Sequence, residues 1–190
     1  MVKIFFSSGH MANQPGAIVG DLNEYEIAYD ITQKLEDHFK EDKRIEFRYG
    51  WPLAQKIDHI NDQSDYYDLV IELHFNAAYR EGACGTEVWY WSKKEEIFAR
   101  IFQRNILELG GKDRGIKTGA YWRLIKGKKI WYTLAFLRRT IPMALILEPL
   151  FLTNLEDAAA IRRKSFRMIL VSKLYHALIE SCNLLEREAQ

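Results

Sequence analysis

Four side chains in this sequence are of types that together bind zinc and carry out hydrolysis: His10, Glu24, His74 and Glu148. Two imidazoles and one carboxylate supply the three protein ligands of a catalytic zinc site, whose fourth position is left for water. A second carboxylate can then act as the general base toward that water. The residue types alone leave open which of the two carboxylates would bind the metal.

Each of these residues also has an interpretation without function. A histidine that follows a strand is more often an ordinary loop residue, and a glutamate such as Glu148 often marks the end of an apolar strand. Glu24 places a favourable charge at a helix N-terminus. Asn23 and Glu26 have the spacing of a capping box, which explains Glu26 structurally. A metal site therefore requires a fold that brings the four side chains together.

The elements expected to position three of the four residues are short apolar strands that end in loops. Glu24 instead opens a helix whose apolar residues recur every four positions. Because ligands bind at the carboxyl edge of a parallel α/β sheet, we expect all four side chains at that edge. The three apolar strand runs, each with the site residue at or just past its end, are 2–6 with His10, 68–74 with His74, and 143–147 with Glu148.

Strand and helix patterns alternate along the rest of the chain. This alternation predicts an α/β fold, with a mostly parallel twisted sheet and helices on both faces. Residues 1–190 contain no internal repeat and no low-complexity linker, so we expect a single domain. Further strands are expected at 44–49, 86–91 and 134–137, helices at 52–60 and 95–109, a loop or hairpin at 112–133, a helix capped by Asn154, and a long closing helix.

The net charge of +1 conceals an uneven distribution. Residues 1–90 contain 8 Lys/Arg and 16 Asp/Glu, whereas residues 91–190 contain 19 and 10. The basic excess is densest between Lys112 and Arg139. It could form a basic flank for an anionic polymer such as nucleic acid or cell-wall material, or a solvated face that balances the acidic half.

The cysteines and the apolar runs bear on the compartment. Cys84 and Cys182 lie far apart in no metal-type spacing, and Cys182 falls on an apolar helical stripe. The run 2–6 is too short for the apolar part of a signal peptide, and no stretch reaches 18 apolar residues. We therefore expect synthesis in the cytoplasm without a signal peptide, and no stable membrane association.

Several segments share their order and spacing with the motifs of a known family: Ser8-Gly9-His10, Glu24, Leu73-His74-Phe75-Asn76-Ala77, and 141–148 with 151–154. They resemble the zinc-dependent N-acetylmuramoyl-L-alanine amidases of type 3, which cleave peptidoglycan. Weaker similarities lie at 85–90 and at 113–117, the second near the family's substrate groove. The resemblance implies that His10, Glu24 and His74 bind Zn²⁺ and that Glu148 is the catalytic residue.

Three positions depart from the family pattern. Met11 and Leu150 stand where glycine is common, and Glu72 stands where a small residue is usual. Two residues along a strand span about 6.6–6.8 Å, and Glu72 shares a strand face with His74. Glu72 could therefore orient His74 as a second layer around the metal, or it could narrow the site.

The resemblance also implies a substrate and a role. It implies that residues 1–190 form one amidase catalytic domain, whose partner is peptidoglycan and not nucleic acid. The role would be endolysin-like, with action on the cell wall after release, and Tyr121 and Trp122 could stack on sugar rings or pack in the core. Two alternatives remain: a zinc amidohydrolase of similar fold for a small acyl-amino acid, and a wall-binding module without turnover. Retention of all four site residues argues against the second.

Overall fold

The computed structural model describes residues 2–78, 82–125 and 128–190, and from 122 to 125 the backbone alone. The side chains of Trp122 and Arg123, and all of Lys126, therefore lie outside the described part of the chain. Six strands form the central sheet of the described residues: β1 (Ile4–Ser8), β4 (Ile45–Arg48), β5 (Leu69–Leu73), β6 (Thr86–Tyr90), β7 (Asp113–Thr118) and β10 (Met143–Glu148).

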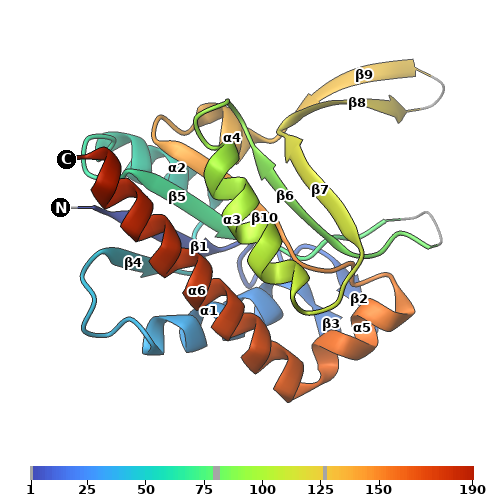
Figure 1. Cartoon of the computed structure of the whole chain (residues 1–190). Helices are drawn as coiled ribbons and strands as arrows, with labels where there is room; N and C mark the ends of the chain where they lie inside the picture. The colour runs from blue at the N-terminus through green and yellow to red at the C-terminus, as the bar shows by residue number, and fades with distance from the viewer. Residues whose placement is uncertain (1, 79–81, 126–127) are drawn as a thin grey trace.

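The order of strands in this sheet is β4-β1-β5-β10-β6-β7 (Figure 1). Neighbouring strands are parallel except β10 and β6, which run antiparallel. The predicted α/β fold with a mostly parallel sheet is therefore confirmed. The carboxyl ends of β1, β5 and β10 lie side by side, because β5 pairs with both of the others in parallel register.

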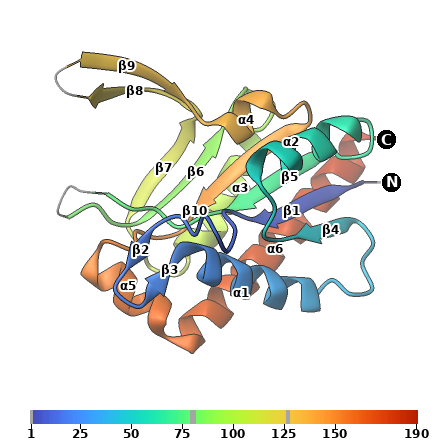
Figure 2. The same ribbon diagram turned by 180° about the vertical axis from the view of Figure 1, so that it is seen from behind.

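Helices cover both faces of the sheet, as predicted (Figures 1 and 2). They are α1 (Glu24–Asp37), α2 (Leu53–Asp62), α3 (Glu96–Leu107), α4 (Ala135–Arg139), α5 (Leu155–Arg162) and α6 (Lys164–Glu188). The core under α1, α3 and α6 receives Phe6, Ile71 and Leu145 from the strands. The core under α2 and α4 receives Phe5 and Val70. Burial on both faces explains why these strands are continuous apolar runs.

One predicted strand is wrong. Residues 134–137, expected to be a strand, contain the start of α4, in which Phe136 and Leu137 are buried. An apolar run of four residues fits a buried strand and a buried helical turn equally well.

The segment 112–133 is also more regular than predicted. Its first part is β7, which pairs with β6 at the edge of the main sheet, and only β8 (Ala120–Ile125) and β9 (Lys128–Thr133) form a hairpin. The hairpin extends away from the sheet (Figures 1 and 2). A positive φ of 76° at Gly115 and a register shift between Thr86 and Val88 interrupt β7, so its sequence shows no strand period.

The chain between β1 and α1 contains a small hairpin of β2 (Ile18–Val19) and β3 (Leu22–Asn23). Asn23 then caps α1, because its side-chain oxygen accepts a hydrogen bond from the backbone N–H of Glu26 at 3.3 Å. The predicted helix start is therefore confirmed. Across the described residues, no helix combines the length and apolar character needed to cross a lipid bilayer.

Candidate metal centre

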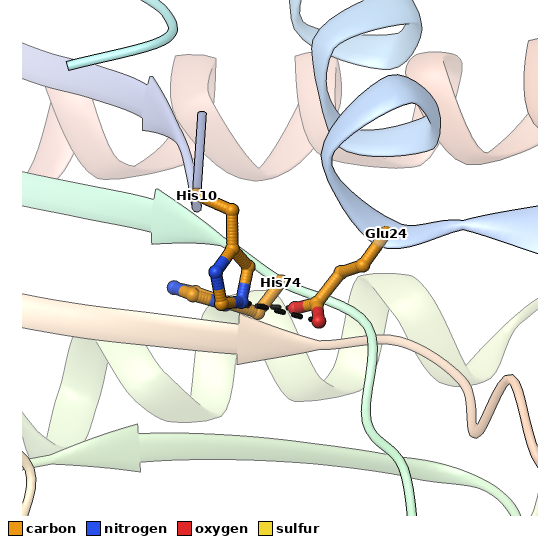
Figure 3. A group of neighbouring side chains, drawn as sticks. All are labelled: His10, Glu24 and His74. Carbon is orange, nitrogen blue, oxygen red and sulfur yellow. Dashed lines mark hydrogen bonds and ion pairs between the residues drawn. The ribbon is translucent and has the colours of Figure 1, made fainter. Parts of the chain in front are cut away.

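The fold brings the predicted residues to one edge of the sheet. His74 directly follows β5, Glu148 is the last residue of β10, and His10 lies two residues beyond β1. Glu24, the first residue of α1, reaches the same point from outside the sheet (Figure 3).

Backbone hydrogen bonds continue the sheet register past the ends of the strands. Gly9 N–H donates to the carbonyl of Leu73 at 2.7 Å, and His74 N–H donates to the carbonyl of Leu147 at 2.9 Å. The segment before each histidine is therefore fixed against its neighbouring strand. His10 itself has a φ of 60°, in the left-handed region that is uncommon for residues other than glycine.

Among the described residues, one group of His, Cys, Asp or Glu side chains could hold a metal ion, and it consists of His10, Glu24 and His74. The ligand atoms of these three residues all lie within 4.8 Å of one another. Glu24 contacts both rings: its Oε2 lies 3.1 Å from Nε2 of His10, and its Oε1 lies 2.9 Å from Nδ1 of His74. The two rings meet edge to face, with centroids 4.8 Å apart. Two nitrogens and one carboxylate that converge in this way match the donor set of a catalytic zinc site.

Backbone N–H groups hold the Glu24 carboxylate in place. Ala17 N–H donates to Oε2 at 2.9 Å, and Phe75 N–H donates to Oε1 at 3.1 Å. Burial would raise the pKa of Glu24, but hydrogen bonds from His10 and His74 outweigh it and hold the pKa well below its usual range. Glu24 is thus ionised and fixed, as a metal ligand must be.

Two glycines leave the space that these ligands occupy. A Cβ at Gly16 would lie 2.4 Å from Oε2 of Glu24 and 2.5 Å from Nε2 of His10. A Cβ at Gly9 would lie within 2.6 Å of three ring atoms of His74. The three ligands and the glycines around them therefore fit a bound zinc ion.

Behind His74 lies a buried ion pair. Nε2 of His74 is 3.1 Å from Oε2 of Glu72, and Oε1 of Glu72 is 2.5 Å from Nζ of Lys56. Burial would raise the pKa of Glu72, but Lys56 and His74 lower it to about 2. Burial would likewise lower the pKa of His74, but the charges of Glu72 and Glu24 raise it well above its usual range.

Glu148 lines a pocket of about 340 Å³ that His74 also lines. Its Oε2 is fully buried and has no hydrogen-bond partner among the described residues. Burial raises the pKa of Glu148 to about 8; the nearby carboxylates add to this shift and His74 opposes it. The lining residues of the pocket are His74, Asn76, Glu87, Trp89, Tyr121, Leu134, Ile146 and Glu148.

Beside Glu148, the wall of this pocket carries a second carboxylate, that of Glu87, which is paired with Glu148 across strands β10 and β6. Glu87 accepts hydrogen bonds from Arg114 at 2.5 Å, from Lys117, and from the side-chain amide of Asn76 at 2.8 Å. Burial would raise the pKa of Glu87, but Lys117 and Arg114 outweigh it and hold the pKa below its usual range. Trp89 and Tyr121 lie against each other here, with ring centroids 5.4 Å apart.

Sequence reasoning placed the four site residues at one edge, and the structure brings them there. It proposed a contact between Glu72 and His74, which is present, but it did not identify Lys56 or Glu87 as part of the site. One available signal was Glu72 itself, because a charge within a fully buried strand requires a partner. Lys56 adjoins Ile57 on the buried side of α2, and this position was the corresponding signal on the helix.

The family model described as N-acetylmuramoyl-L-alanine amidase matches residues 4–180. Among curated proteins, N-acetylmuramoyl-L-alanine amidase LytC of Bacillus subtilis (strain 168) is 25% identical over 172 residues, which cover 86% of this chain and 32% of that protein. The chain thus spans about a third of the length of this curated relative.

Solved structures share the fold. The catalytic domain of CwlV, an N-acetylmuramoyl-L-alanine amidase from Bacillus (Paenibacillus) polymyxa, superposes with a TM-score of 0.81 at 19% identity, covering 96% of this chain and 99% of that one. The catalytic domain of CD27L endolysin, which targets Clostridia difficile, gives 0.72 at 25% identity, covering 95% and 98%. Because the family model matches most of its length, the chain belongs to the N-acetylmuramoyl-L-alanine amidase family.

Proposed function

We propose that this chain is a zinc-dependent amidase that hydrolyses the amide bond between N-acetylmuramic acid and L-alanine in peptidoglycan. Membership of the family supports the reaction. The observation that carries the proposal is the convergence of His10, Glu24 and His74 beside a pocket that contains the unpartnered, buried oxygen of Glu148.

The metal would be held by Nε2 of His10, a carboxylate oxygen of Glu24 and Nδ1 of His74, the atoms that face one another. When bound, zinc polarises the scissile carbonyl and makes water more acidic. The backbone N–H groups of Ala17 and Phe75 keep Glu24 oriented toward this point.

Glu148 would move the protons of the reaction. Burial holds the pKa of Glu148 at about 8 when no metal is bound. A bound cation beside it would lower that pKa, so that the carboxylate could accept a proton from the attacking water. The water oxygen then bonds to the carbonyl carbon, the carbon–nitrogen bond breaks, and Glu148 passes the proton to the departing nitrogen of L-alanine. The products are a carboxylic acid on the muramic side and a free amine on the peptide.

The surroundings of the site suit an extended substrate. Besides the pocket at Glu148, a hollow of about 410 Å³ is lined by Ala17–Val19, Ala77, Ala78 and Thr153. Both hollows border the segment that follows His74. A glycan strand with a stem peptide on each muramic residue needs such room on both sides of the scissile bond.

We further propose that residues 1–190 act as one catalytic domain, that peptidoglycan is its partner, and that the role is lysis of the cell wall after release from the cell. The fold shared with the catalytic domain of CD27L endolysin supports a lytic role. A zinc-loaded sample should clear a suspension of permeabilised bacteria, as followed by turbidity. If the sample cleaves isolated peptidoglycan but does not clear the cells, the proposed lytic role is wrong and the proposed reaction stands.

Mass spectrometry of digested peptidoglycan tests the reaction. The expected products are stem peptides with a free N-terminal L-alanine, formed in proportion to enzyme and lost after a chelator has removed the metal. The proposal would be contradicted if the enzyme hydrolysed small acyl-amino acids but left peptidoglycan uncleaved. Cleavage of the wall at a different bond would contradict it as well.

A further inference from the structure

The ion pair of Lys56 and Glu72 lies in one of the most enclosed places in the molecule. Lys56 is 1% exposed and Glu72 is 4% exposed. Two charges taken out of water at this depth contribute little net stability, and apolar residues of similar volume often serve as well or better. Attachment of α2 to the sheet therefore does not by itself explain why a buried ion pair stands here.

Lys56 connects the two strands that lead to the histidines. Its ammonium group donates to the backbone carbonyl of Ser8 at 2.9 Å and to Oε1 of Glu72 at 2.5 Å. Ser8 is the last residue of β1 and precedes His10 by two positions, and Glu72 precedes His74 by two positions. A single side chain from α2 thus fixes the backbone before one candidate ligand and the side chain behind the other.

Glu72 divides its two oxygens between two partners. Oε1 faces Lys56, whereas Oε2 lies 3.1 Å from Nε2 of His74. Nδ1 of the same ring faces Glu24 at 2.9 Å. In a neutral imidazole one nitrogen carries the proton and the other the lone pair. A hydrogen bond from Nε2–H to Glu72 leaves the lone pair on Nδ1, directed at the candidate metal centre.

We propose that Lys56 and Glu72 are positioning residues that orient His74 for metal binding through Nδ1 and thereby strengthen the metal affinity of the site. This inference rests on the proposed function, because it assigns a task to residues behind one of the proposed zinc ligands. Lys56 holds the Glu72 side chain in place, and the hydrogen bond that Nε2–H of His74 donates to Glu72 fixes the ring and makes it a better electron donor. Hydrogen-bond partners behind metal ligands contribute roughly 10- to 100-fold to metal affinity in proteins.

The test replaces the pair without leaving a buried charge. The double variant Lys56→Met/Glu72→Leu substitutes apolar side chains of similar volume, so it should remain as stable as the parent toward denaturant. Its zinc affinity, measured by competition with a chromophoric chelator, should nevertheless be about 10- to 100-fold weaker. Asn105→Leu is the matched control, because Asn105 is buried and hydrogen-bonded to Ile101 and Glu180, in the helical layer of α3 and α6. This control should leave zinc affinity unchanged.

A second variant covers the case in which the first does not fold. Lys56→Met/Glu72→Gln keeps a side-chain oxygen that can accept the hydrogen bond from Nε2–H of His74. It should bind zinc less tightly than the parent, and more tightly than Lys56→Met/Glu72→Leu where that variant folds. In ¹⁵N NMR spectra of the zinc-loaded parent, His74 should show a protonated Nε2 that is protected from exchange with water, and this signal should broaden or vanish when Glu72 is replaced.

The outcomes separate this inference from the function on which it rests. A parent that binds zinc, together with folded pair variants that bind it equally tightly, would show that the pair is structural only and overturn the inference. Coordination of zinc through Nε2 of His74 would overturn it as well. A parent that binds no zinc would instead overturn the proposed function itself.

Discussion

Glu24 is the residue on which both candidate histidine ligands converge, and this defines what each side chain should do. Its two oxygens contact different rings, and backbone N–H groups of Ala17 and Phe75 hold the carboxylate between them. A metal that replaces these direct contacts would keep the three donors close to their present positions. The site is thus preorganised, and loss of one ligand should be felt in metal affinity before it is felt in folding.

The first prediction concerns metal content. His10→Ala and His74→Ala should each lose most of the roughly one zinc per chain expected for the parent, because only two protein ligands remain. Elemental analysis after dialysis measures this loss. Undiminished zinc in both variants would place the metal somewhere else in the molecule.

The second prediction separates catalysis from metal binding. Glu148→Gln should keep its zinc but lose peptidoglycan hydrolysis by at least about 100-fold, because the amide cannot accept the water's proton. Glu24→Gln should weaken zinc binding itself. If Glu148→Gln cleaves the wall at the parent rate, Glu148 has no catalytic role.

The raised pKa of Glu148 gives a third prediction, for the metal-free protein. The folded state keeps a proton on Glu148 up to a pH of about 8, whereas the unfolded chain loses it near 4.5. The contribution of Glu148 to the free energy of unfolding is therefore fully present below pH 4.5. It is lost as the pH rises toward 8, by up to about 1.4 kcal/mol per pH unit. Denaturant unfolding at several pH values should show this decline in the parent and a smaller one in Glu148→Gln. If the free energy of unfolding fell equally with pH in the two proteins, burial would not raise the pKa of Glu148.

At the scale of the elements, the loop between β1 and α1 determines whether the ligands can meet. Gly16 has a φ of 75°, and a Cβ at this position would collide with Glu24 and His10. Gly16→Ala should therefore weaken zinc binding strongly. Gly20→Ala is the matched control, since Gly20 has a φ of 60° but no atom within 4 Å of its added Cβ. Zinc titration of both variants distinguishes crowding of the site from backbone strain, and equal affinities would rule out crowding.

The elements also show what sequence patterns could and could not predict. The strands that carry the site were predictable, because β1, β5 and β10 are mostly apolar runs that end at or just before the candidate site residues. The helix α4 was not, because its apolar run is too short to have a period, and β7 was hidden by Gly115 and by its shifted register. Lys56 could not be assigned to the site, because its partner Glu72 lies 16 residues away and only the packing of α2 on the sheet brings them together.

At the scale of the whole molecule, the uneven charge distribution becomes a question about the β8–β9 hairpin. This hairpin extends from the sheet (Figure 1). Lys128 and Lys129 on β9 are exposed. Tyr121 on β8 lines the pocket at Glu148, so the base of the hairpin adjoins the site. Cations on such an arm are well placed to attract an anionic wall.

The fifth prediction tests this attraction. Lys128→Gln/Lys129→Gln should slow the hydrolysis of intact walls and flatten its salt dependence, because Coulombic attraction is screened over about 8 Å at physiological ionic strength. Cleavage of a short, neutral muramyl-peptide should barely change. Lys40→Gln/Lys43→Gln, with the same charge change beyond the end of α1, is the matched control. Equal losses on the wall and on the fragment would show that the two hairpin lysines support the site or the fold instead.

The most direct measurement of the central claim is anomalous diffraction from crystals of the zinc-loaded protein, recorded on both sides of the zinc absorption edge. The account predicts one anomalous peak within bonding distance, about 2.0–2.2 Å, of Nε2 of His10, a carboxylate oxygen of Glu24 and Nδ1 of His74. This peak should adjoin the pocket that contains Glu148. A zinc peak held by other residues, or none in a sample shown to cleave peptidoglycan, would contradict the account.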